Sequence, residues 1–300
     1  MNLKQRVLAT MKSRDVESDF ELFFTRTPGY MWALLFRRLH VHPIAVTIMG
    51  IIIGSASGIF FYYDDLRLNL IGMLMLIWAN WYDCADGQLA RMTGQRTLIG
   101  RILDGFAGDV WFFCIYLALL LRLWPEWGIW IFLLEAWAGL YCHTRQCALG
   151  DYYRNIHLWA VFGQDSSELD SSAQQQQHMH SLRWFSKDWF EKFYLFFYVR
   201  YTRSQERQTP DFQKLRPLFE NLPLNDSMRE QFRKESLPIM PLCNIITFDT
   251  RVIVLFLTLI IGHPWIYFIF EATVLEAVRH YTRHCHETFC RKFYHILSAI

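Results

Sequence analysis

The sequence predicts an all-helical (all-α), polytopic membrane protein: a six-transmembrane-helix bundle with an N-terminal interfacial helix and a cytosolic insert. Two observations carry this prediction. Apolar residues make up 53% and aromatic residues 17% of the 300 residues. The apolar residues gather in stretches of about 20, the length at which a helix crosses the roughly 30 Å hydrocarbon core of a bilayer. Charged segments separate these stretches.

Residues 1–42 form the predicted interfacial helix, because basic and large apolar side chains alternate along them. This pattern is typical of a helix that lies among lipid headgroups at a basic, cytosolic surface. An ordinary amphipathic helix packed on the protein is the alternative. The basic residues are Lys4, Arg6, Lys12, Arg14, Arg26, Arg37 and Arg38. No short apolar core precedes a small-residue cleavage site, so we expect no signal peptide.

The first four spans fall within residues 43–148, which form the predicted catalytic region. Pro43 begins the first span, as proline is tolerated in the first turn of a helix, and no charge follows until residue 64. The next spans are expected at about 69–90, 98–121 and 127–148. The Trp-Pro-Glu-Trp sequence at 124–127 is predicted to be an interfacial turn.

Residues 149–243 are the predicted cytosolic insert, since their composition shifts to charged and polar residues. The glutamine run Gln174–Gln177 is predicted to lie in a disordered loop. The aromatic-rich piece Trp184–Arg200 has the composition of a segment that lies along the membrane surface. The insert is therefore expected to be partly disordered and partly helical.

Two further spans occupy residues 244–283, and a cytosolic tail is expected at 284–300. The fifth span runs over about 244–262, and Gly262-His263-Pro264 turns the chain into the sixth, about 265–283. Near the tail stand four residues of metal-ligand types, His280, His284, Cys285 and His286. Their spacing fits no zinc pattern, so we expect them to be solvated.

Basic residues predict the orientation of the spans. The segments 1–42, 91–101 and 149–243 hold 7, 3 and 12 lysines and arginines, whereas the opposite loops hold only Arg67 and Arg122. By the positive-inside rule, we expect the N-terminus to lie in the cytosol. The segment 91–101 then also lies on the cytosolic side, together with the acidic residues that flank it. These features are common to bacterial inner membranes and eukaryotic endomembranes. A net charge of only +2 gives no reason to expect a nucleic-acid partner.

Three carboxylates stand near the polar turn between the second and third spans. At 100° per residue, one face of the second helix carries Asp83, Asp86, Gly87 and Ala90. Gly100 and Asp104, four residues apart, share a face of the third helix, and Arg91 is close by in sequence. Ionisable residues at membrane depth mark functional sites. Hard cations prefer carboxylate oxygens, and a diphosphate binds such cations together with an arginine.

These residues read Asp-x-x-Asp-Gly-x-x-Ala-Arg, followed after eight residues by Gly-x-x-x-Asp. The run resembles the signature of the CDP-alcohol phosphotransferases (CDP-alcohol phosphatidyltransferases). The family pattern ends with one more Asp, four residues after the position of Asp104. This chain has Gly108 there, and its acid comes one residue later, as Asp109.

The resemblance implies a membrane enzyme that transfers a substituted phosphate group from a CDP-alcohol, with CDP-diacylglycerol favoured, to an acceptor hydroxyl and releases CMP. It implies a two-metal site for Mg²⁺ or Mn²⁺ with the ligands Asp83, Asp86, Asp104 and Asp109. Asp109 is the implied general base, with Asp104 as its catalytic partner. The candidate substrate-binding residues are Gly87, Ala90, Arg91, Gly100, Arg145 and Arg154. Arg145 and Arg154 also fit an ordinary positive-inside flank. A homodimer is a further implication.

The position of Asp109 leaves two possibilities open. In a regular helix, a residue five positions after Asp104 is rotated from it by about 140°, whereas a residue four positions on is rotated by about 40°. Either a π-bulge, eased by Gly105 and Gly108, returns Asp109 to the site, or another acid replaces it as base.

Other functions remain possible at this stage. One is phosphocholine or phosphoethanolamine transfer from a soluble CDP-alcohol to a lipid acceptor. A catalytically impaired relative is another, because the fourth acid is displaced. A third is an intramembrane cation-binding transport protein, although the acids lie at one side of the membrane. The last is a set of buried acids that pair only with Arg91, Arg96 and Arg101. The seven cysteines are scattered without a Cys-x-x-Cys pair and indicate neither a disulfide framework nor a zinc site.

Overall fold

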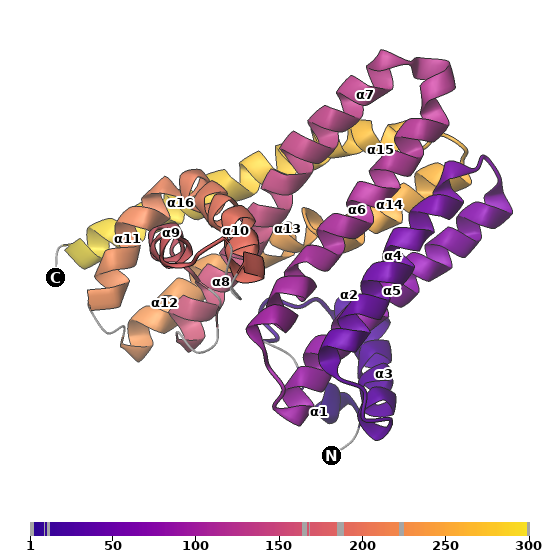
Figure 1. The fold of residues 1–300 in the computed structure, drawn as a ribbon. Coiled ribbons are helices and arrows are strands. Elements are labelled where there is room, and N and C mark those ends of the chain that lie inside the picture. Colours follow the sequence, from indigo (N-terminus) through magenta and orange to yellow (C-terminus); the bar gives the residue numbers. More distant parts are fainter. Residues whose placement is uncertain are drawn as a thin grey trace. The chain divides into compact units, whose positions relative to one another are not determined.

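The structure is a computed structural model that describes residues 3–8, 10, 13–163, 167, 169–184, 189–221 and 225–298. Every regular element in these ranges is a helix (Figure 1), which confirms the all-helical prediction for the described part of the chain. Lys12, one of the basic residues of the predicted interfacial helix, lies outside the described residues. The chain divides into two compact units, Met1–Leu140 with Val252–Phe270 and Tyr141–Arg251 with Glu271–Ile300.

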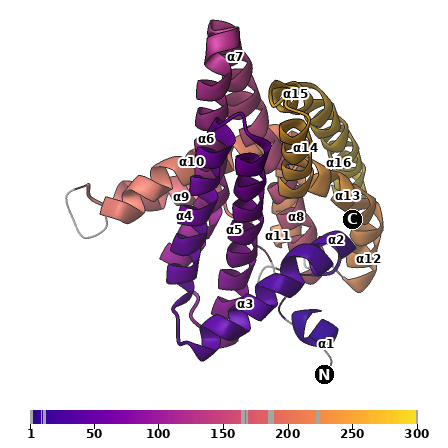
Figure 2. The same cartoon turned by 90° about the vertical axis from the view of Figure 1, so that its right-hand side faces the viewer.

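Three long helices form the core of the first unit: α4 (Pro43–Tyr62), α5 (Leu66–Thr93) and α6 (Leu98–Trp127). They lie side by side, and α4 packs against both of the others (Figures 1 and 2). At 1.5 Å per residue their lengths are roughly 30, 42 and 45 Å. They stand where the first three spans were expected, and α5 and α6 extend beyond the predicted ends.

Small residues on α4 let the helices approach closely. A Cβ on Gly54 would meet the indole of Trp111 on α6 at 2.3 Å, and one on Gly58 would meet the Cys114 carbonyl oxygen at 2.8 Å. The Trp111 indole nitrogen donates to the Gly50 carbonyl at 3.1 Å. Without a hydrophobic drive between helices in lipid, such close packing through small residues is a main source of association.

Local sequence explains where these helices end. The Asp65 side chain caps α5 by accepting from the Arg67 and Leu68 backbone amides at 2.9 and 3.0 Å. Gly94, at φ 70°, ends α5 in the left-handed conformation that favours glycine. The predicted interfacial turn at 124–127 is wrong: α6 continues through it and stops at Gly128, φ 52°. Proline in the last turn removes one hydrogen bond without stopping the helix, whereas the positive φ at Gly128 does stop it.

The N-terminal part consists of α1 (Leu3–Leu8), α2 (Asp19–Glu21), the π-helix η1 (Leu22–Arg26) and α3 (Thr27–Arg38). Figure 2 shows α3 at the end of the three-helix core where α5 stops and α6 starts, and α3 packs on α5. Phe20, Phe23 and Phe24 are exposed, as an interfacial segment requires. Its place in the membrane stays a prediction.

After Gly128 the chain is helical without interruption through α7 (Ile129–Glu135), the π-helix η2 (Ala136–His143) and α8 (Thr144–Phe162). Near the C-terminus α14 (Phe248–Ile260) is followed, after the predicted turn at Gly262 (φ 75°), by α15 (Trp265–Phe270), the π-helix η5 (Glu271–Leu275) and α16 (Glu276–Ser298). In the first unit, α7 packs against α15.

Three helical stretches in the described residues are long and apolar enough to cross a membrane: Pro43–Tyr62, Ile99–Trp127 and Asp226–Ile260. The predicted count of six spans is not confirmed and stays a prediction. Helix α5, the α7–α8 stretch and the α15–α16 stretch are not among these three.

The second unit also contains α9 (Ser172–Ser181), α10 (Trp189–Gln208), α11 (Pro210–Asn221), α12 (Asp226–Ser236), the 3₁₀ turn η4 (Leu237–Ile239) and α13 (Met240–Ile245). The disordered loop predicted at Gln174–Gln177 is wrong, because these residues lie in α9. Glutamine is a good helix former, and Glu206 accepts from the Ser172 amide at 2.8 Å, which anchors the start of α9. Helix α16 continues through the predicted tail to Ser298. The prediction of solvated metal-ligand types is wrong for His286, which is fully buried, while His280 and His284 are exposed.

Candidate active site

The structure brings three of the predicted acids together. Asp83 and Asp86 lie on α5, and Asp104 lies near the start of the neighbouring α6. The carboxyl groups of Asp83 and Asp104 are within hydrogen-bonding range of each other. Asp86 is close enough to both for their charges to interact. This convergence follows from the unbroken helical register of α5 and from the turn at 94–97 that reverses the chain into α6.

The three acids differ in exposure. Asp86 is only 3% exposed, Asp83 is partly buried and Asp104 is exposed. The hydroxyl of Thr47, on α4, lies within hydrogen-bonding range of the Asp86 carboxylate. One oxygen of that carboxylate, Oδ2, is buried and has no hydrogen-bond partner among the described residues. The site therefore runs from a buried acid to an accessible one.

This donor set fits divalent cations. Carboxylates held this close repel one another, and a cation between them removes the repulsion. A buried acceptor without a partner costs about 1–3 kcal/mol, so Oδ2 of Asp86 is better placed as a ligand than as a structural group. Oxygen ligands of this kind are those that Mg²⁺ binds.

Arg91 lies beside the acids, one turn after Gly87 on α5. A Cβ on Gly87 would come within 3.5 Å of the Arg91 Nη1, so the guanidinium lies along the glycine. Its Nε is buried and has no hydrogen-bond partner among the described residues. The charges of Arg26, Glu17 and Asp104 all act on Arg91. The guanidinium thus lies within reach of the charge of Asp104.

Arg26 is a site residue that sequence reasoning placed only in a basic surface segment. Its guanidinium forms an ion pair with Glu17 at 2.8 Å, and its side chain is 24% exposed. Burial alone would lower the pKa of Arg26. The neighbouring Cys84, Glu17, Glu21 and Asp83 outweigh burial and raise that pKa above its usual value. Arg26 is therefore a permanent cation beside Asp83.

Tertiary contacts hold Arg26 there. The Gln88 side chain donates to the Arg26 carbonyl at 3.2 Å, and the Trp81 indole donates to the Phe24 carbonyl at 2.8 Å. Gly29 lets α3 reach α5, because a Cβ on it would lie 2.7 Å from the Cys84 Cβ. A sequence signal was available: Ser18 and Glu21 form a capping box that starts this helical segment.

Gly100 and Ala90 flank the site. Thr97 caps α6, accepting from the Gly100 amide at 3.0 Å, and a Cβ on Gly100 would meet the same hydroxyl oxygen at 3.0 Å. Ala90 is partly buried, one turn after Asp86 on α5. The start of α6 lies next to the acids, and free amides at a helix N-terminus favour anions.

Asp109 does not join the three acids. Helix α6 is regular through residues 104–109, so the π-bulge considered for this segment is absent. Asp109 is exposed and rotated by about 140° from Asp104 around the helix. The alternative, in which another acid supplies the base, is the one compatible with this helix.

Arg145 and Arg154 belong to the second unit, where each has partners. Arg145 donates to the Tyr141 hydroxyl and stacks 4.4 Å from the centre of its ring. Arg154 donates to Asn244 at 2.8 Å and to Thr247 at 2.6 Å. Their role in substrate binding stays a prediction.

Comparison with known proteins identifies the region around the acids. Residues 40–149 match the family model described as CDP-alcohol phosphatidyltransferase. No curated protein and no solved structure matches the chain. The family consists of membrane transferases of phospholipid synthesis that generally depend on Mg²⁺ or Mn²⁺. Residues 40–149, which contain Asp83, Asp86 and Asp104, are therefore a CDP-alcohol phosphatidyltransferase domain.

Proposed function

We propose that this protein is a metal-dependent CDP-alcohol phosphotransferase that transfers a substituted phosphate group to an acceptor hydroxyl and releases CMP, with CDP-diacylglycerol as the favoured donor. The observation that carries the proposal is the convergence of Asp83, Asp86 and Asp104 inside the family-matched region. CDP-diacylglycerol is favoured because the acids lie at one end of long membrane-type helices, where a donor anchored in the bilayer presents its headgroup.

The three acids are the proposed ligands of two Mg²⁺ or Mn²⁺ ions, with the unpartnered Oδ2 of Asp86 as the most buried donor. Bound there, the ions neutralise the diphosphate and favour an in-line attack on it. Asp86 is fixed by burial and by Thr47. Asp83 and Asp104 complete the donor set from the two facing helices.

Arginines and small residues are proposed to receive the nucleotide. Arg91 and Arg26 both carry charge next to the acids, which supports a role in contacting phosphate oxygens. Two guanidiniums that act on each other are stabilised by an anion between them. Gly87 and Ala90 have no bulky side chain, so they leave space for the nucleotide on the acid-bearing face of α5. Gly100 leaves space in the same way at the start of α6.

Asp104 is the proposed general base in place of Asp109. It is the exposed acid of the three, so an acceptor hydroxyl can reach it, whereas Asp109 points away. The acceptor oxygen forms a bond to the β-phosphorus of the CDP-alcohol while the bond from that phosphorus to the CMP oxygen breaks. The hydroxyl proton passes to the Asp104 carboxylate.

The test is CMP release by membranes that contain the protein. CDP-diacylglycerol is offered with polar acceptors (inositol, inositol phosphate, glycerol phosphate, serine), and CDP-choline or CDP-ethanolamine is offered with diacylglycerol. We expect Mg²⁺- or Mn²⁺-dependent release with CDP-diacylglycerol and none from the Asp83→Asn variant. Release only with a soluble CDP-alcohol would assign the lipid-acceptor reaction instead. Release with neither donor would reject the enzyme function.

A further inference from the structure

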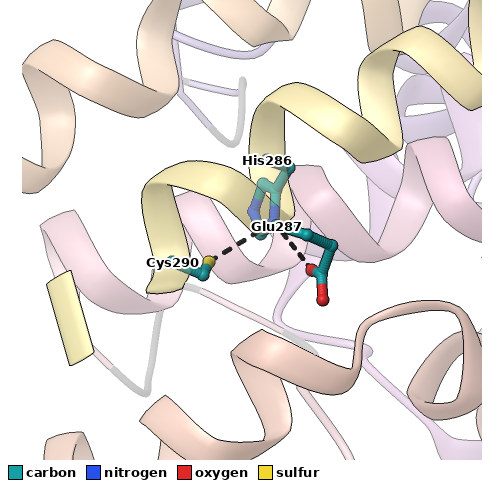
Figure 3. A group of neighbouring side chains, drawn as sticks. All are labelled: His286, Glu287 and Cys290. Atoms are coloured by element: carbon teal, nitrogen blue, oxygen red, sulfur yellow. Dashed lines mark hydrogen bonds and ion pairs between the residues drawn. The ribbon is translucent and has the colours of Figure 1, made fainter. Parts of the chain in front are cut away.

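The middle of α16 carries a buried group of three side chains whose chemistry is that of zinc ligands. His286 and Cys290 are fully buried, and Glu287 is 7% exposed (Figure 3). His286 and Cys290 are four residues apart and so share one face of the helix. Figure 3 shows the imidazole between the thiol and the carboxylate. The group lies in the second unit and shares no residue with the acids of α5 and α6.

The His286–Glu287 distance suits a shared ion better than a hydrogen bond, and the His286–Cys290 distance suits either. The His286 Nδ1 lies 3.5 Å from Glu287 Oε1 and 3.5 Å from Cys290 Sγ. A good N–H···O bond is about 2.7–3.2 Å long. Tetrahedral zinc with bonds of about 2.0–2.3 Å places neighbouring ligand atoms about 3.3–3.6 Å apart. All three ligand atoms lie within 4.8 Å of one another, so a single ion can reach them with small side-chain movements.

The charge of Glu287 also points to a cation. In the described ranges no lysine or arginine forms an ion pair with this buried carboxylate. The charge of Arg291 acts on it from farther away, and the group at ion-pair distance is His286 itself. A buried carboxylate without a cation in contact is expensive. Its other oxygen, Oε2, accepts from the Asp211 amide at 2.7 Å, in the first turn of α11. This hydrogen bond holds Oε2 and leaves Oε1 facing His286. Residues behind the ligands of a metal site orient those ligands in the same way.

Tyr153 packs directly on the group. The Tyr153 ring stacks on His286 with centres 3.7 Å apart. Its hydroxyl is buried without a hydrogen-bond partner in the described part of the chain, and the charges of Glu287 and Cys290 act on it. A buried hydroxyl without a partner is better explained when a ligand or an ordered water completes its environment.

We propose that His286 Nδ1, Glu287 Oε1 and Cys290 Sγ bind one Zn²⁺ ion, with a water held by the Tyr153 hydroxyl in the fourth position. On binding, the Cys290 S–H bond breaks, its proton leaves to solvent and a sulfur–zinc bond forms. One thiolate and one carboxylate then balance the charge of the ion inside a buried site. Thiolate and imidazole select zinc over the hard cations proposed for the aspartate site. The ion stabilises the packing of α16 against α8 and α11.

The test uses the full chain in detergent, stripped with a chelator and dialysed against zinc. Metal content is measured by mass spectrometry, and Co²⁺ serves as a spectroscopic probe. We expect stoichiometric zinc and a thiolate-to-cobalt charge-transfer band. Cys290→Ser should abolish the band, and His286→Ala should weaken zinc binding more than about tenfold. A wild-type chain that binds no zinc would overturn the proposal.

Matched variants separate this site from folding and from the acids. Cys285→Ser changes a half-buried thiol on the same helix and should keep both the band and the zinc. Glu287→Gln keeps the volume and an acceptor for the Asp211 amide, so it should keep native helicity by circular dichroism while zinc binding weakens. Asp83→Asn should leave zinc binding unchanged. Loss of the band in Cys285→Ser with retention in Cys290→Ser, or loss of zinc in Asp83→Asn, would refute the assignment.

Discussion

Asp104 and Asp109 are both exposed acids on α6, and they differ in what their side chains face. Asp104 lies beside Asp83, whereas Asp109 is rotated away by about 140°. Asp104→Asn is expected to lower the rate of CMP release by at least about 100-fold, the lower range for loss of a general base. Asp109→Asn is expected to keep the rate within a few-fold. Initial rates in membranes with matched protein levels measure both, and an equal loss in the two variants would restore Asp109 to the mechanism.

Asp211 gives the second unit a pH-dependent contribution to stability. Burial raises the pKa of Asp211, but hydrogen bonds from Arg291 at 2.7 Å and Lys214 at 3.0 Å outweigh it, and the pKa lies below its usual value. A carboxyl whose pKa is lower in the folded chain stabilises the fold above its unfolded pKa, about 3.9, and loses that effect as pH falls through the folded pKa.

Asp211→Asn should therefore lower the midpoint of thermal unfolding at pH 7, and the difference from the wild type should shrink as the pH falls through the lowered pKa of the folded chain. Circular dichroism melts at several pH values measure this. Arg291→Gln should reproduce part of the loss at neutral pH. A difference that stays constant from neutral to acid pH would show that the Asp211 charge is not responsible.

Sequence reasoning reached Asp83, Asp86 and Asp104 but missed the site role of Arg26, and the reason is physical. The acids are brought together by one helical period on α5 and by a short turn, both readable locally. Arg26 reaches Asp83 through contacts that join residues far apart in sequence, such as Gln88 to the Arg26 carbonyl. No local pattern encodes such a contact.

At the scale of elements, Gly29 decides how closely α3 packs on α5. A Cβ there would lie 2.7 Å from the Cys84 Cβ, which is attached directly to the backbone and cannot swing aside. Gly29→Ala should push α3 away, cost about 1–3 kcal/mol and displace Arg26. Thermal unfolding and the KM for the CDP-alcohol measure the two effects.

Gly105→Ala is the matched control for Gly29→Ala. No atom lies within 4 Å of a Cβ at this helical glycine. The substitution should leave KM unchanged and raise stability by up to about 1 kcal/mol, since alanine is the better helix former. Equal destabilisation by both variants would contradict the packing argument.

The three π-helical segments of the described chain share a property that period analysis does not detect. Arg26 is the last residue of η1, His143 is the last of η2 and Glu271 is the first of η5. An extra residue in a turn rotates the following side chains, so a charged residue can leave the lipid-facing side. A 3.6-residue period in the sequence predicts the helices but does not locate the π-helical insertions within them. The π-bulge considered at residues 104–109 is absent.

Two of these π-helices meet in a buried charge network of the second unit. Arg251 and Glu271 are fully buried and form an ion pair, and His143 lies 2.9 Å from the same carboxylate. The Gln146 side chain donates to the Glu271 carbonyl at 3.0 Å. These contacts join η2 and the start of α8 to η5 and to Arg251 in the first turn of α14.

Arg251→Met should lower stability by about 3–5 kcal/mol, because it leaves the Glu271 carboxylate buried without its cation. The double variant Arg251→Met/Glu271→Leu should recover most of that loss, since neither charge remains. Melting of the purified chain in detergent, followed by circular dichroism, compares the two. A double variant less stable than the single one would show that the pair itself, rather than an unpaired charge, sets the stability.

For the whole molecule, composition predicted helices almost throughout, and the structure confirms this in the described residues. The number of membrane crossings is harder to predict, because the helices that carry the chemistry are also the more polar ones. Helix α5 is 28 residues long, enough for about 42 Å, yet it is not among the three apolar stretches. Length favours a crossing, and average hydropathy does not.

Reporter fusions decide between six crossings and three. With six, a reporter after residue 64 is outside the cytosol, and reporters after residue 95 and at the C-terminus are inside. If only Pro43–Tyr62, Ile99–Trp127 and Asp226–Ile260 cross, residue 95 and the C-terminus both lie outside. We expect the six-crossing pattern, because α5 must return to the side of the N-terminus for Asp83 to meet Asp104 at the start of α6. An external reporter at residue 95 would place the acids on the non-cytosolic side, out of reach of a cytosolic nucleotide, and would contradict both the topology and the proposed function.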